Sequence, residues 1–183
     1  MELTKINFNH KILKSLLIAF IGSICLAISA KIKIPFYPIP MTMQTFVVIF
    51  LGISFGYKIG LASVSLYLFE GIIGLPVFSN SPERGIGLVY FLGPTMGYLL
   101  GFLLAVFLAG YFDLKKNIST IFIKLSLSVS VIYIFGILWL GNLIGWDKPI
   151  FELGVMPFLP AEIFKILLLT LLAKPLLNLR KFT

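Results

Sequence analysis

The chain has 183 residues, of which 59% are hydrophobic and only 12% are charged, and its mean hydropathy is +1.05. A soluble domain carries about 25% charged residues, and the deficit here extends along the whole chain. The composition therefore excludes a soluble domain with a single anchor and indicates a polytopic membrane protein. The net charge of +8 could suggest nucleic acid, but basic residues in so apolar a chain more often mark cytoplasmic loops.

Six apolar segments follow one another along the chain, and a spanning helix needs about 20 mostly apolar residues. The first segment lacks a small-residue cleavage site, so we interpret it as a transmembrane helix and not as a signal peptide. The second and third are short and are separated only by Gly56, Tyr57 and Lys58, which tilting or partial insertion would accommodate. We expect an all-α membrane protein, a compact bundle of six transmembrane helices in one domain (residues 1–183). The predicted spans are Ile12 to Ala30, Thr42 to Tyr57, Ile59 to Leu75, Leu88 to Tyr111, Ser119 to Ile144 and Pro160 to Leu177.

Basic residues are distributed unequally between the two sides that six spans define. Of the 15 lysines and arginines, ten lie on the side of the termini and of the second and fourth connections, counting those in the adjoining ends of spans. Four lie on the other side, and the intramembrane Lys165 is counted with neither. Positive charge concentrates in cytoplasmic loops. We therefore expect both termini in the cytoplasm and the protein in the cytoplasmic membrane of a bacterium. The same distribution explains the basic net charge and removes the argument for a nucleic-acid partner.

The three connections on the outer side are longer and rich in proline: Lys31 to Met41, Pro76 to Gly87 and Gly145 to Met156. Proline fixes its own backbone and restricts the preceding residue, so these loops are stiffened. Irregular backbone at membrane depth is tolerated only where it is buried in protein or lines a cavity. The stretch from Gly71 to Phe102 joins two apolar segments through such a loop, and we interpret it as part of a binding site that opens outwards.

Two ionisable residues lie at the start of the sixth predicted span, and such residues mark functional sites by default. Glu162 and Lys165 are three residues apart, so both face one side of the helix. Pro160 suits the first helical turn, and a carboxylate suits the positive end of the helix dipole. Spacing alone leaves two interpretations open: a structural ion pair that pins the helix end, or an acceptor and a donor for the polar head of a ligand.

Other polar residues near the outer side are weaker candidates. Thr42 and Gln44 open the second predicted span, where interhelical hydrogen bonding is the alternative to ligand contact. Asn80 lies at the tip of the second outer loop, where solvated polar residues need no special explanation. A tyrosine such as Tyr98 is more often a packing or interfacial residue. Glu70 ends the third span and can face either a cavity or the surface.

The sequence lacks the residue sets that catalysis and metal binding require. Cys25 is the single cysteine and His10 the single histidine, so no zinc, haem or disulfide pattern exists. No activated nucleophile or acid–base pair accompanies Glu162 or Glu70. No GxxxxGK[ST] segment for binding nucleotide phosphates is present. We therefore expect no catalytic residues, no metal and no cofactor, and any energy from ATP must come from partners.

Ala19, Ser23 and Ala27 form a stripe of small residues on the first predicted span. Such stripes allow another helix to approach closely. That helix can belong to this chain or to another protein, and we predict a partner contact at these residues.

Four motifs occur in a specific order along the chain. They are PIPMTMQT (Pro38 to Thr45), GIIGLPVF (Gly71 to Phe78), LGPTMGYLLGF (Leu92 to Phe102) and PFLPAEIFK (Pro157 to Lys165). Together they closely resemble the BioY family, the biotin-binding membrane subunit of energy-coupling factor (ECF) transporters. The likeness covers nearly the whole chain and is strongest from Gly71 to Phe102. It implies a six-helix bundle that binds biotin from outside, beneath the first and third connecting loops.

The resemblance also implies partners and site residues. Family members normally use a membrane scaffold subunit with two ATPases, and the small-residue stripe is similar to the surface that meets the scaffold. The family places an acid and a lysine in a Gly-Asp-x-x-Lys pattern where Glu162 and Lys165 stand, so the acid here is one methylene longer. Asn80 is similar to the family's polar ligand contact, in a loop where SNSPERGIG replaces a more glycine-rich segment. The hypothesis assigns the polar head of biotin to Glu162, Lys165 and Asn80. The weaker candidates for the lining are Gln44, Thr42 and Tyr98.

Three functions stay open beside biotin uptake. The chain could bind another vitamin, since related subunits share an architecture but not a ligand. It could be a structural membrane protein that assembles through the Ala19 stripe, which predicts no saturable ligand. An intramembrane enzyme using Glu162 or Glu70 is the least supported. The sequence is compatible with an energy-coupling module and with a solitary protein or homo-oligomer embedded in the lipid bilayer.

Overall fold

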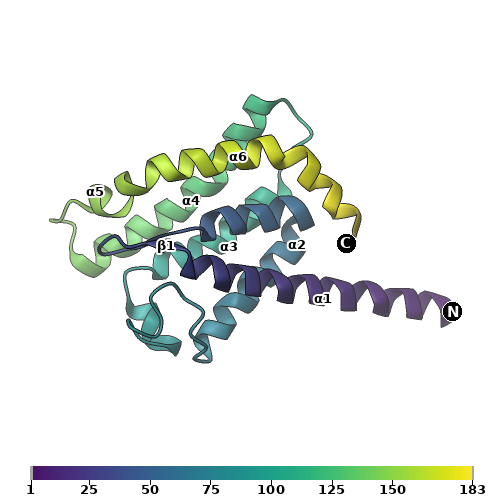
Figure 1. Cartoon of the computed structure of the whole chain (residues 1–183), viewed down its shortest axis with the longest axis horizontal. Helices are drawn as coiled ribbons and strands as arrows, with labels where there is room; N and C mark the ends of the chain where they lie inside the picture. Colours follow the sequence, from purple (N-terminus) through teal and green to yellow (C-terminus); the bar gives the residue numbers. More distant parts are fainter. Residues whose placement is uncertain (1, 183) are drawn as a thin grey trace.

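The computed structural model describes the backbone of residues 2–182 and the side chains of residues 11–181. Most of this part of the chain is helical (Figure 1). The α-helices are α1 (Glu2–Lys31), α2 (Gln44–Ile72), α3 (Met96–Tyr111), α4 (Ile118–Ile144), α5 (Ile150–Gly154) and α6 (Leu159–Leu177). The short 3-10 helices are η1 (Gly87–Leu92), η2 (Met156–Phe158) and η3 (Asn178–Phe182), and the two-residue strands are β1 (Lys33–Ile34) and β2 (Met41–Thr42).

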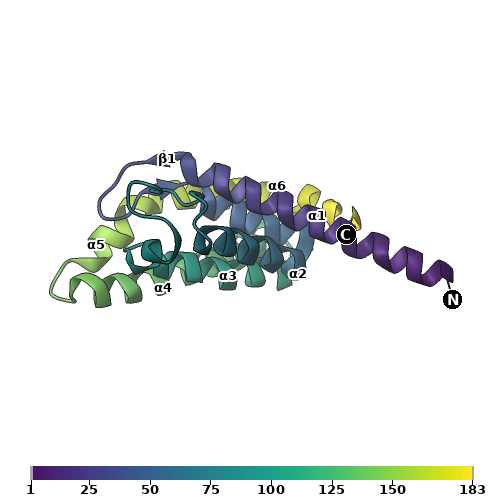
Figure 2. The ribbon, with the colours of Figure 1, turned by 90° about the horizontal axis from the view of Figure 1, so that it is seen from below.

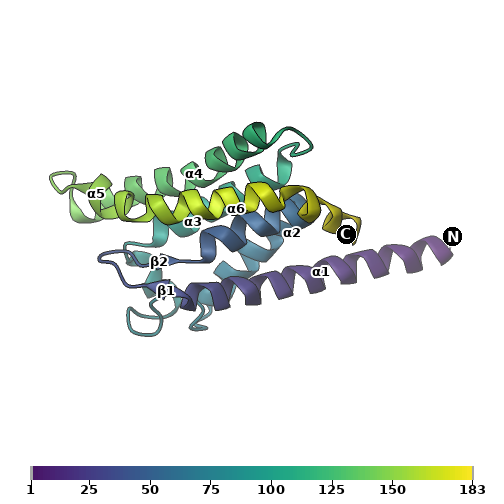
Figure 3. The ribbon, with the colours of Figure 1, turned by 45° about the horizontal axis from the view of Figure 1, so that its top comes forward.

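The helices form an elongated bundle with two different ends. Figures 1, 2 and 3 place both termini at one end, where α1 continues beyond the other helices, and place α5 and the long connections at the opposite end. We call these the terminal end and the loop end. At the loop end, β1 and β2 pair as a minimal antiparallel ribbon, with Lys33 opposite Thr42.

The second and third predicted spans are the two limbs of α2, which bends sharply at Gly56. This residue has φ 78° and ψ 171°, a backbone conformation that residues with a side chain rarely adopt. The limbs diverge from the bend (Figure 1), and Gly52 and Gly60 let both limbs approach α3 closely, because a Cβ atom at either position would overlap Val106. α3 packs directly on the bend, because a Cβ atom at Gly110 would overlap the backbone of Tyr57.

The fourth predicted span begins later than expected. Residues 87–92 form η1, and the regular helix α3 begins at Met96 and not at Leu88. Gly93 is extended, with ψ 174°, because a proline disfavours a helical conformation in the residue before it. α3 is consequently a short apolar helix, whereas α1, α2, α4 and the segment containing α6 are long and apolar enough to cross a membrane. The predicted all-α membrane bundle is confirmed, with the second and third predicted spans joined in the single helix α2.

The core of the bundle is organised around α2. It packs against α1 on one side and α3 on the other, α3 packs on α4, and α6 contacts both α2 and α4 (Figure 3). Gly97 and Gly101 bring α3 against the backbone of α4 at Phe135 and Ile132. These contacts fix the beginnings of α2, α3 and α6 relative to one another at the loop end.

The small-residue stripe on α1 faces α2 within the same chain. Ala19 is 4% exposed and Ser23 is 0% exposed, and Ser23 Oγ donates a hydrogen bond to Glu70 Oε1 at 2.8 Å. Ala27 is partly buried and packs on the same core. The small size of these residues lets α1 approach α2 closely, so the helix that packs on Ala19 and Ser23 in this structure belongs to the same chain.

Candidate functional site

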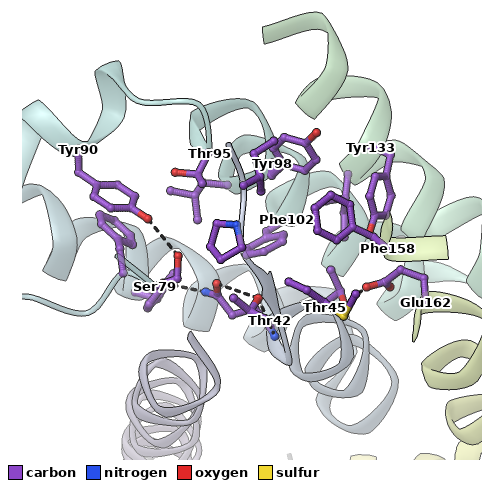
Figure 4. A pocket seen from close by; sticks show the side chains of 18 residues that line it. Thr42, Thr45, Ser79, Tyr90, Thr95, Tyr98, Phe102, Tyr133, Phe158 and Glu162 are labelled. Atoms are coloured by element: carbon purple, nitrogen blue, oxygen red, sulfur yellow. Dashed lines mark hydrogen bonds between the residues drawn. The ribbon is translucent and has the colours of Figure 1, made fainter. Parts of the chain in front are cut away.

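A pocket lies at the loop end, beneath the connections between the helices (Figure 4). It comprises about 550 Å³ including its open side. Three helices begin here: α2 at Gln44, α3 at Met96 and α6 at Leu159. The first limb of α2, residues 44–55, is only ~18 Å long, so it begins well inside the bundle. The space that a longer helix would fill is therefore available to a ligand, at the positive ends of three helix dipoles.

The pocket walls are mostly apolar and aromatic. The phenyl ring of Phe78 stacks on Tyr90, with ring centroids 4.5 Å apart, and meets Tyr67 edge-on at 5.3 Å. On the opposite wall Phe158 lies 6.2 Å from the ring of Tyr133. Such walls can cover an apolar ring. The lining residues are Ile39, Pro40, Met41, Thr42, Gln44, Thr45, Tyr67, Phe78, Ser79, Tyr90, Thr95, Tyr98, Leu99, Phe102, Ile132, Tyr133, Phe158 and Glu162.

Glu162 is the charged residue of this lining, and it belongs to the first turn of α6. Its side chain is buried, with a residue exposure of 4%. The Oε1 atom accepts hydrogen bonds from Thr45 Oγ1 at 2.8 Å and from Lys165 Nζ at 2.7 Å. The Oε2 atom is also buried but has no hydrogen-bond partner among the described residues. A buried carboxylate oxygen without a partner is costly, and a ligand donor in the pocket would satisfy it.

Lys165 lies behind the carboxylate and is not part of the pocket lining. Its Nζ atom donates to Glu162 Oε1, to Thr45 Oγ1 at 2.9 Å and to the Thr42 backbone oxygen at 2.7 Å. An ammonium group has three donors, so all of them are used within the protein. The arrangement makes Lys165 the counter-ion that fixes the carboxylate, and it joins α6 to the start of α2.

Thr42 and Gln44 line the pocket, as expected for residues that open α2. Gln44 Nε2 donates to Tyr67 Oη at 2.7 Å, and the Thr42 hydroxyl lies 3.3 Å from Gln44 Oε1. Because the amide hydrogen bond to Tyr67 joins the two limbs of α2, it also fixes the orientation of the Gln44 side chain. These groups form a polar patch on an otherwise apolar wall.

Tyr98 also lines the pocket, but through its ring. Its hydroxyl donates to the Gly154 backbone oxygen at 2.9 Å, so the phenol joins α3 to α5. The close approach of the ring to α4 depends on Gly136, where a Cβ atom would overlap it. The structure therefore gives Tyr98 a packing and positioning role at the wall.

Asn80 does not line the pocket. Its Oδ1 atom accepts a hydrogen bond from Lys33 Nζ at 3.0 Å, on the outer side of the loop. The neighbouring residues Phe78 and Ser79 face the pocket instead, and the hydroxyls of Ser79 and Tyr90 lie 3.2 Å apart. The structure thus brings four of the six predicted binding residues into the lining, places Lys165 directly behind it and leaves Asn80 outside.

Basic side chains hold the outer loops together over the pocket. Lys31 Nζ donates to the backbone oxygens of Phe78 and Ser81 at 2.8 and 2.9 Å. Lys33 Nζ donates to the Ser79 backbone oxygen at 2.7 Å. In the opposite direction, Arg84 Nη1 donates to the Pro38 backbone oxygen at 2.6 Å. The first outer connection therefore holds the second in place, and the second holds the first.

Sequence reasoning missed most of the aromatic lining. Tyr67, Tyr90 and Tyr133 lie outside the four motifs, and no local pattern separates a pocket wall from a core position. Other members of the lining were accessible from the sequence, among them Phe102 and Phe158, which lie in two of the motifs. Thr45 belongs to the same polar stretch as Thr42 and Gln44, and Phe78 ends the GIIGLPVF motif.

Comparison with known proteins gives one family and a consistent set of relatives. The model of the BioY family matches residues 3–182. A probable biotin transporter of Pyrococcus horikoshii is 35% identical over 139 residues, which are 76% of this chain and 81% of the relative. A biotin transporter of Thermotoga maritima is 31% identical over 162 residues, or 88% of this chain and 94% of the relative.

A solved structure is similar to the fold described above. It is a crystal structure of the S-component for biotin from an ECF-type ABC transporter. The two structures have a TM-score of 0.76 at 27% sequence identity, over 92% of this chain and 93% of that one. The similarity thus extends over nearly the entire length of both chains. The family match over residues 3–182 and the fold agree: this chain belongs to the BioY family.

Proposed function

We propose that this protein takes up biotin as the S component of an ECF-type transporter, and that the pocket at the loop end binds the vitamin. The observation that carries the proposal is the unpartnered Oε2 atom of Glu162, a buried acceptor in an aromatic pocket. The similarity to biotin transporters and to a biotin S-component supports the same ligand.

The chemistry of biotin fits these walls. Its ureido group presents two N–H donors and a carbonyl acceptor, its sulfur ring is apolar, and its chain ends in a carboxylate. Glu162 Oε2 accepts from a ureido N–H, and the side chains of Thr42 and Gln44 contribute further polar contacts. Lys165 contributes by fixing the charge of Glu162 and does not itself touch the ligand. Tyr98 contributes its ring to the apolar wall.

The carboxylate chain of biotin points towards the outer loops in this proposal. The described lining contains Glu162 but no lysine or arginine. The part of the pocket near Glu162 therefore favours hydrogen-bond donors of the ligand and disfavours its carboxylate. Lys31, Lys33 and Arg84 are the basic residues of the outer connections that border the pocket. Their positive charge favours a carboxylate at the mouth, while Asn80 stays on the outer side of the loop.

In this function the protein has a defined orientation in the membrane and requires partners for ATP-driven uptake. The loop end faces outwards and the terminal end faces the cytoplasm of a bacterium, because the terminal end carries most of the basic residues.

The whole chain acts as one substrate-binding unit without catalysis or a cofactor. It contains no GxxxxGK[ST] segment, so ATP-driven uptake requires a membrane scaffold and an ATPase pair. Uptake by the chain alone or by a homo-oligomer is the alternative, and uptake measured with and without an energy-coupling module separates the two.

Replacing Glu162 by glutamine tests the proposed acceptor. The substitution keeps the shape but removes the charge, and a hydrogen bond to a charged group contributes about 1.5–3 kcal/mol. Calorimetric titration of the purified protein should therefore show biotin affinity lowered ~10- to 100-fold, and Glu162→Asp should retain more affinity than Glu162→Gln. Glu152→Gln is the matched control, because Glu152 is an exposed acid at the same end. Unchanged affinity in Glu162→Gln would contradict the assignment.

Replacing Lys165 by methionine tests its role as the buried counter-ion. The single substitution leaves the Glu162 carboxylate buried without a positive partner, which costs about 3–5 kcal/mol. Unfolding measurements in detergent should show a large loss of stability for Lys165→Met. The double variant Glu162→Gln/Lys165→Met should regain part of that loss, because no charge is left uncompensated. Additive losses in the double variant would rule out the pair as described.

Replacing Lys31 by methionine tests whether the outer loops retain the ligand. Without its hydrogen bonds to the Phe78 and Ser81 oxygens, the loop that carries Phe78 should open more often. A chase experiment with radiolabelled biotin should show dissociation ~10-fold faster, the equivalent of one lost charged hydrogen bond. Lys148→Met serves as the control, since Lys148 is an exposed lysine at the same end that pairs with Asp147. Equal dissociation rates in the two variants and the wild type would show that Lys31 does not control the loop.

A further inference from the structure

A second hollow, separate from the biotin pocket, lies at the terminal end. It is bounded by α1, the bend of α2, the end of α3 and the C-terminal segment, and it comprises about 1530 Å³ including its open side. Its walls are apolar at Leu16, Phe55 and Ile59. We call it the α1 groove. It is open along α1, where Leu16 is 61% exposed.

Three basic residues line the α1 groove: Lys11, Lys58 and Arg180. None of the described lining residues is acidic. Lys11 and Lys58 are exposed and can turn towards a ligand. Arg180 is held in place, because its Nε donates to the Ile53 backbone oxygen at 2.8 Å and its Nη2 to the Gly110 backbone oxygen at 3.0 Å. The groove therefore combines an apolar channel with a positive end, and its described lining carries no carboxylate.

Aromatic side chains line the α1 groove beside its basic residues. Tyr57 and Tyr111 line the groove, and Tyr57 meets Phe107 edge-on with ring centroids 5.5 Å apart. Tyrosines gather where the hydrocarbon of a membrane meets the headgroups. The positive end of the groove therefore lies at headgroup depth, and the exposed apolar side of α1 lies along the acyl chains.

We propose that the α1 groove binds an anionic phospholipid. The phosphate lies between Lys11, Lys58 and Arg180, and an acyl chain follows the apolar wall formed by Leu16 and Phe55. Basic pockets between transmembrane helices bind anionic headgroups in this way. A partner protein would have to bring its own carboxylates to this depth, whereas a lipid phosphate is already present there. The site is independent of which vitamin occupies the outer pocket.

Native mass spectrometry of the full-length protein tests the proposal with phosphatidylglycerol and phosphatidylcholine as probes. The wild type should retain one phosphatidylglycerol in preference to phosphatidylcholine. Lys11→Gln/Lys58→Gln should bind phosphatidylglycerol ~30-fold more weakly, from the usual contribution of two basic residues near a membrane surface. Lys115→Gln/Lys116→Gln is the matched control, because it removes two exposed lysines from the connection between α3 and α4, at the same end but outside the groove. The control should bind like the wild type.

Three outcomes would overturn the proposal. The wild type could show no preference for phosphatidylglycerol, or both double variants could lose the same affinity for it. Thirdly, the groove variant could retain the lipid but no longer copurify with an energy-coupling scaffold. The last result would make the groove a protein-docking surface. Biotin titration of the same samples monitors the outer pocket, so a failure of the lipid site is distinguishable from a failure of the proposed biotin site.

Discussion

The buried ion pair between Glu162 and Lys165 is the interaction on which the site depends. Two charges inside a membrane bundle are costly unless they are paired and hydrogen-bonded. Here Thr45 and the Thr42 backbone oxygen complete the coordination of the ammonium group, with 2.9 and 2.7 Å contacts. The pair therefore requires α6 and the start of α2 to stay in register. It leaves one carboxylate oxygen without a hydrogen-bond partner among the described residues, and in the proposed function this atom accepts from the ligand.

The bend at Gly56 and the late start of α3 create the room around this carboxylate. Because both helices begin inside the bundle, the outer loops can descend over the space and supply Phe78 and Ser79 to its walls. The cations Lys31, Lys33 and Arg84 hold these loops mainly through backbone oxygens, and Lys33 also donates to the Asn80 side chain. The cover over the pocket thus depends largely on backbone geometry.

The fold could be predicted largely from the sequence, because apolar length and the distribution of charge determine membrane spans. The start of α3 could not, since Gly93 and Pro94 interrupt a segment that is apolar throughout. Glu162 could be singled out because it is a charged residue in an apolar span. Its spacing from Lys165 could not show that all three donors of Lys165 Nζ are used within the protein, behind the pocket lining. Asn80 and the Ala19 stripe illustrate the same limit. Their residue types permit ligand or partner contact, and only the three-dimensional packing shows that Ser23 faces Glu70 and Asn80 faces Lys33.

In the function proposed above, this membrane bundle presents one fixed acceptor to the ureido group of biotin. The proposed hydrogen bond runs from a ureido N–H to Glu162 Oε2. A change in the ligand, which leaves the protein intact, therefore gives the most direct test. Calorimetric titration of the purified wild-type protein should show saturable binding of biotin and binding at least ~10-fold weaker for biotin methylated at the ureido nitrogens, because the donors are lost. Equal affinity for biotin and the methylated analogue would contradict the account.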